Sequence, residues 1–153
     1  MEITPQKDEP IIEIIARAII VDKNSEKILF CAPKNESYFY LPGGHIEFGE
    51  TATIALAREL KEETGEEISP SKFSFVGTNE NLFTQNEKFH HEINLYFHLD
   101  GVFSSEQKII SKEDNIIFLW ISISELSHYR ILPESIIDMI KKWQEGSNNI
   151  WQQ

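Results

Sequence analysis

Seven residues between positions 44 and 65 have the types and spacings that suit the binding of a divalent cation. They are Gly44, Glu50, Arg58, Glu59, Glu62, Glu63 and Gly65. Residues three and four apart lie on one face of a helix, so Glu59, Glu62 and Glu63 fall within an arc of roughly 100°. Carboxylates at this spacing repel one another, and a bound cation would offset the repulsion. Because oxygen ligands favour Mg²⁺ or Mn²⁺, the segment predicts a metal and diphosphate site.

The residues on either side of this helix complete the predicted site. The run Leu41-Pro42-Gly43-Gly44 predicts a turn without side chains, where the backbone can come close to an ion or a phosphate. Residues 50–53 suit the positive end of a helix, and Gly65 suits its last turn. An apolar stripe on the side opposite the carboxylates is expected to pack against a sheet. Its members are Ile54, Ala57, Leu60 and Thr64.

Arg58 projects cleanly to neither of these helix faces. A guanidinium binds a carboxylate through two parallel hydrogen bonds, so we expect Arg58 to orient Glu59 or Glu50 rather than to contact a substrate. An isolated Glu-rich helix is more often a solvated surface. The glycines, the arginine and the fixed spacings favour the functional interpretation here.

The full pattern, G-x5-E-x7-R-E-x-x-E-E-x-G, resembles the signature of the Nudix hydrolases, which cleave a nucleoside diphosphate linked to another group. The resemblance implies that the three helix carboxylates bind the cation together with the carbonyl of Gly43, and that Arg58 supports them. Gly44 would lie against the substrate. One position departs from the pattern, because Glu66 stands where the family has Ile, Leu or Val. We expect Ile68 to supply the missing apolar contact.

The carboxylate that removes the proton from the attacking water stays open at this point. In the family an acidic residue beyond the signature often completes the metal shell or serves as the base, and Glu92 is the candidate for that residue. The alternatives are Glu50, Glu62 and Glu63.

Two cations upstream of the signature, Arg17 and Lys34, could hold a diphosphate, although each could equally be a surface charge. Several aromatic residues could stack on a base, but aromatic side chains belong more often to the core. We therefore expect one or two of them at most to contact a ligand. They are Phe39, Tyr40, Phe83, Phe89 and Trp120.

Composition limits the class of protein. The chain has 153 residues, 41% of them hydrophobic, which fits one globular domain. Its net charge of −11 argues against nucleic acid as a partner, since such binding needs a positive surface. With Cys31 as the only cysteine there is no internal disulfide, and no signal peptide or membrane span is visible. A cytoplasmic protein with a small-molecule partner is expected.

The hydrophobic pattern predicts strands and helices in mixed order around the signature helix. Expected strands are 11–21, 27–32, 73–78, 90–99 and 116–121, with a turn at 22–26, a short extended piece at 38–41 and a connection over 79–88. A short helix is expected to begin within 122–126, and a last helix to run from Pro133 to about Trp143. Residues 1–9 are interpreted as a polar lead-in, and residues 144–153 as a polar tail.

This order favours an α/β fold with a mixed sheet between helices. The resemblance implies the same fold, a Nudix-type α/β/α sandwich with a loop-helix-loop signature, as a single domain over 1–153. The segments around 80–83 and 91–93 resemble bacterial ADP-ribose pyrophosphatase-like members of the family. Many relatives are homodimers, which leaves a homodimer open here.

The expected activity is Mg²⁺-dependent hydrolysis of the diphosphate linkage in a nucleoside diphosphate derivative, with ADP-ribose or a similar nucleotide sugar slightly favoured. One alternative is the hydrolysis of nucleoside triphosphates, including oxidised ones, as in MutT. Another is a nucleotide sensor without catalysis, although such domains usually lose the signature carboxylates. Removal of diphosphate from RNA 5′ ends fits poorly with the acidic charge.

Overall fold

Within the described part of the chain, seven strands pair into one mixed sheet, and successive side chains of a strand point to its two faces. The computed structural model describes residues 10–22, 24 and 26–153. The strands are β1 (Ile12–Val21), β2 (Lys27–Pro33), β3 (Gly43–His45), β4 (Ser74–Gln85), β5 (Lys88–Asp100), β6 (Ile116–Ser122) and β7 (Ile150–Gln152). Their order is β6-β2-β1-β5-β4-β7, and β3 pairs with β1. Because β1 is parallel to β5 while β2 is antiparallel to β1, the predicted mixed sheet is confirmed.

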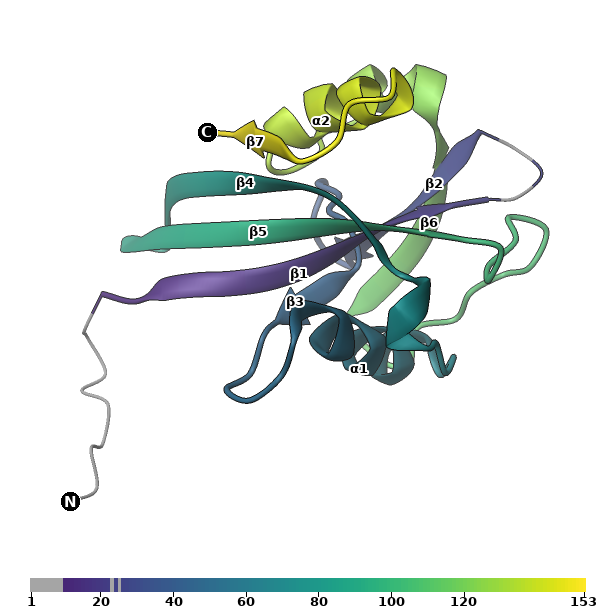
Figure 1. The fold of residues 1–153 in the computed structure, drawn as a ribbon, viewed down its shortest axis with the longest axis horizontal. Coiled ribbons are helices and arrows are strands. Elements are labelled where there is room, and N and C mark those ends of the chain that lie inside the picture. Colours follow the sequence, from purple (N-terminus) through teal and green to yellow (C-terminus); the bar gives the residue numbers. More distant parts are fainter. Residues whose placement is uncertain (1–9, 23, 25) are drawn as a thin grey trace.

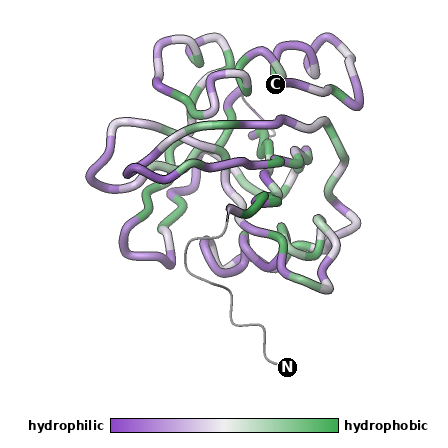
Figure 2. The backbone as a smooth tube through the Cα atoms, turned by 90° about the vertical axis from the view of Figure 1, so that its left-hand side faces the viewer, coloured by the Kyte–Doolittle hydropathy of each residue, from purple (hydrophilic) through white to green (hydrophobic). Residues whose placement is uncertain are grey.

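The α-helices of the described residues cover opposite faces of this sheet. Helix α1 (Ala52–Thr64) packs on one side and α2 (Ser135–Gln144) on the other, with the sheet between them (Figure 1). Two short 3-10 helices, η1 (Pro70–Lys72) and η2 (Ile123–His128), follow α1 and β6. Apolar stretches run along the elements between the layers, whereas hydrophilic stretches lie in the outer loops (Figure 2). The predicted α/β class with helices on both faces is therefore confirmed.

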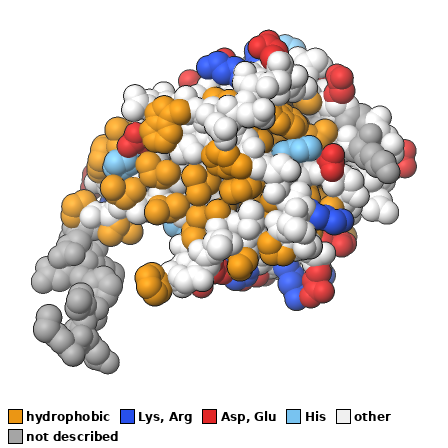
Figure 3. Space-filling view, viewed as in Figure 1, with side chains coloured by type: hydrophobic (Ala, Val, Ile, Leu, Met, Phe, Trp, Pro, Cys, Tyr) orange, Lys and Arg blue, Asp and Glu red, His pale blue; other side chains and the backbone are white. Residues whose placement is uncertain are grey.

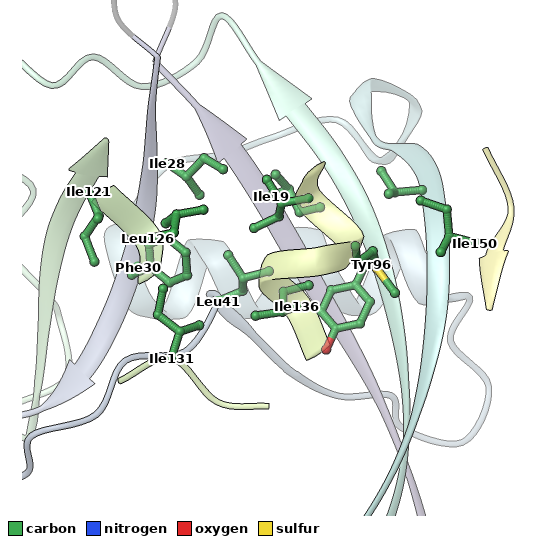
Figure 4. Close-up of a cluster of buried hydrophobic side chains, with 13 residues drawn as sticks. Ile19, Ile28, Phe30, Leu41, Tyr96, Ile121, Leu126, Ile131, Ile136 and Ile150 are labelled. Carbon is green, nitrogen blue, oxygen red and sulfur yellow. The ribbon is translucent and has the colours of Figure 1, made fainter. Parts of the chain in front are cut away.

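Each helix closes a separate hydrophobic core. On the α1 side, Ala16 and Ala18 of β1 contact the cluster that contains Leu60. On the α2 side, Ile19 of β1 belongs to the cluster that contains Ile140 (Figure 4). Successive residues of a strand point to opposite faces, so β1 contributes to both cores. A single strand thus fixes the sheet between the two helices.

The predicted connection over residues 79–88 is wrong, because β4 and β5 continue through it as one long hairpin. Their turn consists of Asn86 and Glu87, both with positive φ, 51° and 64°. Two-residue turns of this conformation match the twist of antiparallel strands, and asparagine adopts them readily. Asn79 and Asn81 therefore lie on a strand face that borders a cleft.

The two predicted polar ends have different outcomes. Residues 1–9 lie outside the described residues, as do residues 23 and 25 of the predicted turn. The expected tail over 144–153 is wrong, because residues 150–152 form β7 and pair with β4. Ile150 is buried in the α2-side core, and a side chain at Gly77 would overlap the Ile150 backbone. Hydrophobic burial of one residue thus holds the end of the chain on the sheet.

No helix among residues 10–22, 24 and 26–153 combines the length and the apolar composition needed to cross a membrane.

Candidate active site

Arg58 of α1 is the centre of the hydrogen-bond network at the predicted site. Its Nε donates to one oxygen of Glu50 at 2.7 Å, and Nη2 donates to the other at 3.0 Å. Nη1 donates to Glu59 at 3.0 Å and to Glu62 at 3.5 Å. Nη2 also donates to the carbonyl of His45 at 3.1 Å, which ties α1 to β3. The bidentate pair therefore forms with Glu50, while Glu59 receives a single bond.

The Glu50 carboxylate is fully engaged by these bonds. Arg58 lowers the pKa of Glu50, and the backbone N–H of Glu47, which donates to Glu50 at 3.1 Å, lowers it further. The same ion pair raises the pKa of Arg58, so the guanidinium stays charged. A carboxylate with a depressed pKa and both oxygens occupied is a poor proton acceptor. Glu50 therefore serves to fix Arg58 and the loop before α1.

Two glycines bring the backbone of β3 close to its neighbours. Gly43 pairs with Arg17 on β1, has φ 138°, and a side chain there would overlap the Ala16 carbonyl. A side chain at Gly44 would instead overlap the carboxyl group of Glu59. The predicted Gly-Gly turn is thus a short strand rather than a loop. Its lack of side chains leaves the space that the Glu59 carboxylate occupies.

Helix α1 begins after Thr51, whose hydroxyl accepts from the N–H of Ile54 at 3.3 Å, and ends at Gly65 in the left-handed conformation with φ 82°. Both boundaries agree with the sequence pattern. The expected apolar stripe is confirmed in part, because Leu60 is buried and Ala57 packs against the α1-side core, whereas Ile54 is 47% exposed. The buried residues of the helix are Ala55, Leu56, Leu60 and Glu63. The helix is therefore rotated so that Glu63 points toward the sheet together with Leu56 and Leu60.

This rotation gives the three helix carboxylates different environments. The side chain of Glu62 is 53% exposed and that of Glu59 is 17% exposed, whereas Glu63 is only 3% exposed as a residue. One Glu63 oxygen, Oε2, has no hydrogen-bond partner among the described residues. Burial, followed by repulsion from Glu59, raises the pKa of Glu63 to about 8. An uncompensated carboxylate at this depth needs a positive partner.

These features fit a divalent cation. Glu59 and Glu63 face the same cleft as Gly43 and Gly44, and all the donors are oxygen atoms. A cation between the two carboxylates would relieve their repulsion and satisfy the unpaired oxygen. Within the described residues, no three His, Cys, Asp or Glu side chains already form a metal-binding group. Arg58 binds Glu59 and Glu62 instead, so these two carboxylates would have to turn toward the cation.

The cleft has a volume of about 1050 Å³ and extends from these glutamates to the start of α2. Arg17 lines it, donating to the carbonyl of Leu41 at 3.2 Å and lying 5.4 Å from the ring centre of Tyr40. Arg17 also counteracts the rise in the pKa of Glu63, which places its charge close to the acidic end. Lys34 is exposed and is not among the lining residues. Of the two predicted cations, the structure brings Arg17 alone to the cleft.

Glu92 and an unpredicted glutamate, Glu113, also line the cleft. Glu92 accepts from Asn94 Nδ2 at 3.2 Å, and its charge contributes to the raised pKa of Tyr96. Glu113 precedes β6 and contributes to the raised pKa of Glu63. No local pattern marks Glu113 in the sequence, because a loop far from the signature brings it to the site.

The aromatic candidates divide between core and cleft, as expected. Phe39 packs edge-on against Tyr129 beside the α2-side core, and Trp120 packs against the α1-side core. Tyr40 and Phe83 line the cleft. Phe89 is 67% exposed and does not line the cleft. Sequence reasoning did not single out Tyr38 and Arg130, which form a further part of the cleft wall.

Replacing Arg58 with lysine should lower turnover by about 10- to 100-fold, the range typical of residues that orient metal ligands. Lysine keeps the positive charge but cannot hold both oxygens of Glu50 while also contacting Glu59. Steady-state kinetics and the melting temperature of R58K would measure the two effects. Lys72→Arg, an exposed exchange of the same residue types in η1, is the control. Full activity in R58K would show that positive charge alone suffices at this position.

The model of the NUDIX domain matches residues 13–142. An ADP-ribose pyrophosphatase of Methanocaldococcus jannaschii is 32% identical over 130 residues, which cover 83% of this chain and 72% of that protein. An 8-oxo-dGTP diphosphatase of Buchnera aphidicola is 30% identical over 119 residues, which cover 75% of this chain and 81% of that protein.

Solved structures show the same fold at lower identity. The MutT protein of Bacillus halodurans superposes with a TM-score of 0.68 at 18% identity, over 91% of this chain and 86% of that one. The dihydroneopterin triphosphate pyrophosphohydrolase of E. coli has a TM-score of 0.68 at 16% identity, over 88% of this chain and 96% of that one.

Proposed function

The chain belongs to the NUDIX domain family, and from this membership we propose that it hydrolyses the diphosphate linkage of a nucleoside diphosphate derivative, with ADP-ribose or a similar nucleotide sugar favoured. It is a hydrolase that acts on phosphorus-containing anhydrides. Members of the family use divalent metals and small nucleotide substrates. The observation that carries the proposal is the buried, half-satisfied carboxylate of Glu63, next to Glu59 and β3 at the acidic end of the cleft.

We assign the metal to Glu59, Glu62, Glu63 and the carbonyl of Gly43, with Mg²⁺ as the cation and Mn²⁺ as a substitute. When bound, the cation would neutralise charge on the diphosphate and lower the pKa of a water molecule. Arg17, which pairs with Gly43, would contact the diphosphate beside the metal, and Arg58 would keep Glu59 in position. Gly44 would let the substrate come close to the backbone of β3.

For the base, the structure favours Glu113 over Glu92. Both line the cleft, but Glu113 is close enough to Glu63 to contribute to its raised pKa, whereas Glu92 shows no such effect. A base must lie within reach of the water that attacks phosphorus, and that water would be held near the metal. Glu50 is occupied by Arg58. We therefore propose Glu113 as the carboxylate that completes proton removal.

The kinetics of two variants would separate these roles. Glu113→Gln should lower kcat about 100-fold or more, because a general base contributes about 10²- to 10⁴-fold. Glu92→Gln should change kcat much less and act mainly on KM. Both variants remove one negative charge from the same cleft, so each is the control for the other. A larger loss of kcat in E92Q than in E113Q would show that Glu92, and not Glu113, is the general base.

Charge in the cleft favours a nucleotide sugar over a nucleoside triphosphate. The lining residues include seven glutamates and two arginines. A triphosphate carries more negative charge than a diphosphate ester, and it would meet more repulsion in this cleft. The similarity to the ADP-ribose pyrophosphatase of M. jannaschii supports the same choice. The similarity to the 8-oxo-dGTP diphosphatase of B. aphidicola keeps oxidised nucleoside triphosphates as the second candidate.

A substrate panel tests the proposal. ADP-ribose, other nucleoside diphosphate sugars, and ordinary and oxidised nucleoside triphosphates would be assayed with Mg²⁺ or Mn²⁺, and the products separated by chromatography. We expect AMP and ribose 5-phosphate from ADP-ribose, no activity in EDTA, and recovery when Mg²⁺ is restored. A kcat/KM that is higher for 8-oxo-dGTP would select the alternative. Tight nucleotide binding without turnover would instead indicate a sensor.

A further inference from the structure

Three polar side chains are buried side by side in the wall of the cleft, where β4 and β5 pair. These residues, Asn79, Asn94 and Tyr96, are here called the polar floor. Asn79 is the pairing partner of Asn94, and Gly77 is the partner of Tyr96, so the three side chains point to the same face of the sheet. Each is at most 2% exposed, and each lines the cleft.

Two atoms of the polar floor have no hydrogen-bond partner among the described residues, Asn79 Oδ1 and the Tyr96 hydroxyl. Asn79 Nδ2 donates to Ser135 Oγ at 3.0 Å and to the Glu80 carbonyl at 3.5 Å. Both of these bonds use the amide nitrogen, so the Asn79 oxygen, which can only accept, is left without a donor. Burying a polar group without a partner costs its hydration, and such atoms in a cleft wall mark where a ligand group would bind.

The Tyr96 hydroxyl suits a ligand group that is itself a hydroxyl. Figure 4 shows the oxygen at the edge of the apolar side chains, past Ile136. Burial raises the pKa of Tyr96, so the hydroxyl stays protonated and can both donate and accept. Ser135 and Ile136, at the start of α2, also line the cleft. A ligand that reaches the floor would therefore lie between β5 and the first turn of α2.

Most of the charged groups near the polar floor are carboxylates. Glu92 and Glu134 line this part of the cleft, and Arg17 of β1 is the pairing partner of Tyr96. The Arg17 guanidinium is held away from the floor, because it donates to the Leu41 carbonyl and lies 5.4 Å from the ring centre of Tyr40, and Arg130 lies 5.9 Å from that of Tyr38. A phosphate at the floor would meet carboxylates, whereas a neutral group with several O–H donors would find acceptors.

We infer that the polar floor is the subsite for the group beyond the diphosphate, and that it selects a sugar by hydrogen bonds between sugar hydroxyls and Asn79 Oδ1 and the Tyr96 hydroxyl. This rests on the proposed hydrolysis of a diphosphate linkage. Sugar hydroxyls both donate and accept, which matches the pair of free atoms. A buried ammonium group would need a carboxylate beside it, whereas the buried side chains of the polar floor are all neutral.

The test compares two substrates in the Tyr96→Phe variant, ADP-ribose and an ADP ester that carries a methyl group in place of the terminal sugar. We expect kcat/KM for ADP-ribose to fall about tenfold, because one hydrogen bond is lost. For the methyl ester it should stay unchanged, and the melting temperature should stay equal or rise. Tyr129→Phe, which removes a hydroxyl from a residue outside the cleft lining, is the control and should leave both substrates unaffected. Equal losses for both substrates in Y96F would overturn the inference.

A second pair of variants tests Asn79 separately. Asn79→Ala removes the acceptor, whereas Ser135→Ala removes only the bond that holds the Asn79 amide. The first should lose discrimination for the sugar, and the second should keep most of it. Binding of α,β-methylene ADP-ribose, measured by calorimetry, gives a readout that needs no turnover. If the wild type cleaves neither substrate, the proposed function fails, and weaker binding of this analogue by Y96F would still support the subsite. Unchanged binding in both Y96F and N79A would refute it.

Discussion

Replacing Glu63 with glutamine should abolish hydrolysis and, at the same time, stabilise the metal-free protein. The variant removes a proposed metal ligand, so we expect kcat to fall about 10³-fold or more. The carboxylate is buried beside Glu59, and burial is the main reason why the pKa of Glu63 is raised to about 8. Glutamine has nearly the same shape without the charge. Activity and stability are therefore expected to change in opposite directions.

The effect on stability has a defined pH dependence. The pKa of Glu63 is about 8 in the folded state and near 4.5 in the unfolded state, so the folded state holds a proton that the unfolded state releases. The stability linked to this proton is complete below pH 4.5 and is lost as the pH rises to 8. At pH 7 in EDTA, the raised pKa of Glu63 lowers the free energy of unfolding by roughly 3 kcal/mol, and E63Q should remove this destabilisation.

Thermal and denaturant unfolding in EDTA between pH 5 and 8 would measure this difference. The wild type should lose stability across that range relative to E63Q. Mg²⁺ should stabilise the wild type and leave E63Q nearly unchanged, because binding to the folded state alone raises its stability. Glu66→Gln, an exposed residue beyond the end of α1, is the matched control with the same charge change. Normal turnover in E63Q, or a protein less stable than the wild type at pH 7, would contradict the assignment.

Replacing Gly44 with alanine should produce a folded protein with about 100-fold lower kcat/KM. Losses of this size are typical when a metal ligand is moved from its position. The added Cβ would overlap the Glu59 carboxyl group, and it meets no backbone atom among its nearest neighbours. The end of a flexible side chain can move aside, so the cost falls on the position of Glu59. We expect weaker Mg²⁺ binding, and a larger loss of activity than of stability.

Titration of Mg²⁺ by calorimetry, together with kcat/KM at saturating metal, would test this expectation. Gly101→Ala is a useful comparison, because Gly101 has φ 70° and open space around its Cα. That variant should lose about 1 kcal/mol of stability through backbone strain, with activity retained. Gly43→Ala should disturb the fold itself, since its Cβ would overlap the backbone of β1. If G44A bound Mg²⁺ as tightly as the wild type, Glu59 would not be a ligand.

An exposed apolar surface lies apart from the cleft. Ile12, Ile14, Leu82 and Phe89 are each 48–67% exposed, and they lie on β1, β4 and β5 on the face opposite the polar floor. Hydrophobic side chains extend over these strands in Figure 3. Nothing in the structure identifies what would cover them, so the homodimer stays a prediction.

Local sequence was sufficient for the features that depend on neighbouring residues. The spacing of Glu59 and Glu63 placed both on one side of a helix, Gly65 ended that helix, and Ile68 supplied the apolar contact that Glu66 does not. Each depends on backbone geometry over a few residues, which repeats in the same way in any protein. The antiparallel pairing of β1 with β2 agrees with the short turn predicted between them. These features therefore follow from the amino-acid sequence by itself.

Only the tertiary structure decided how that helix is rotated and which distant residues join it. Periodicity gives the angles between side chains around a helix, but not which side faces the sheet. Packing of Leu56 and Leu60 turned Glu63 into the interior, so one carboxylate of three became buried and unpaired. Parallel pairing of β1 with β5 placed Arg17 beside Tyr96, 79 residues later in the chain, and β4 added Asn79. Such contacts depend on the whole chain closing two hydrophobic cores at once, and no local pattern encodes them.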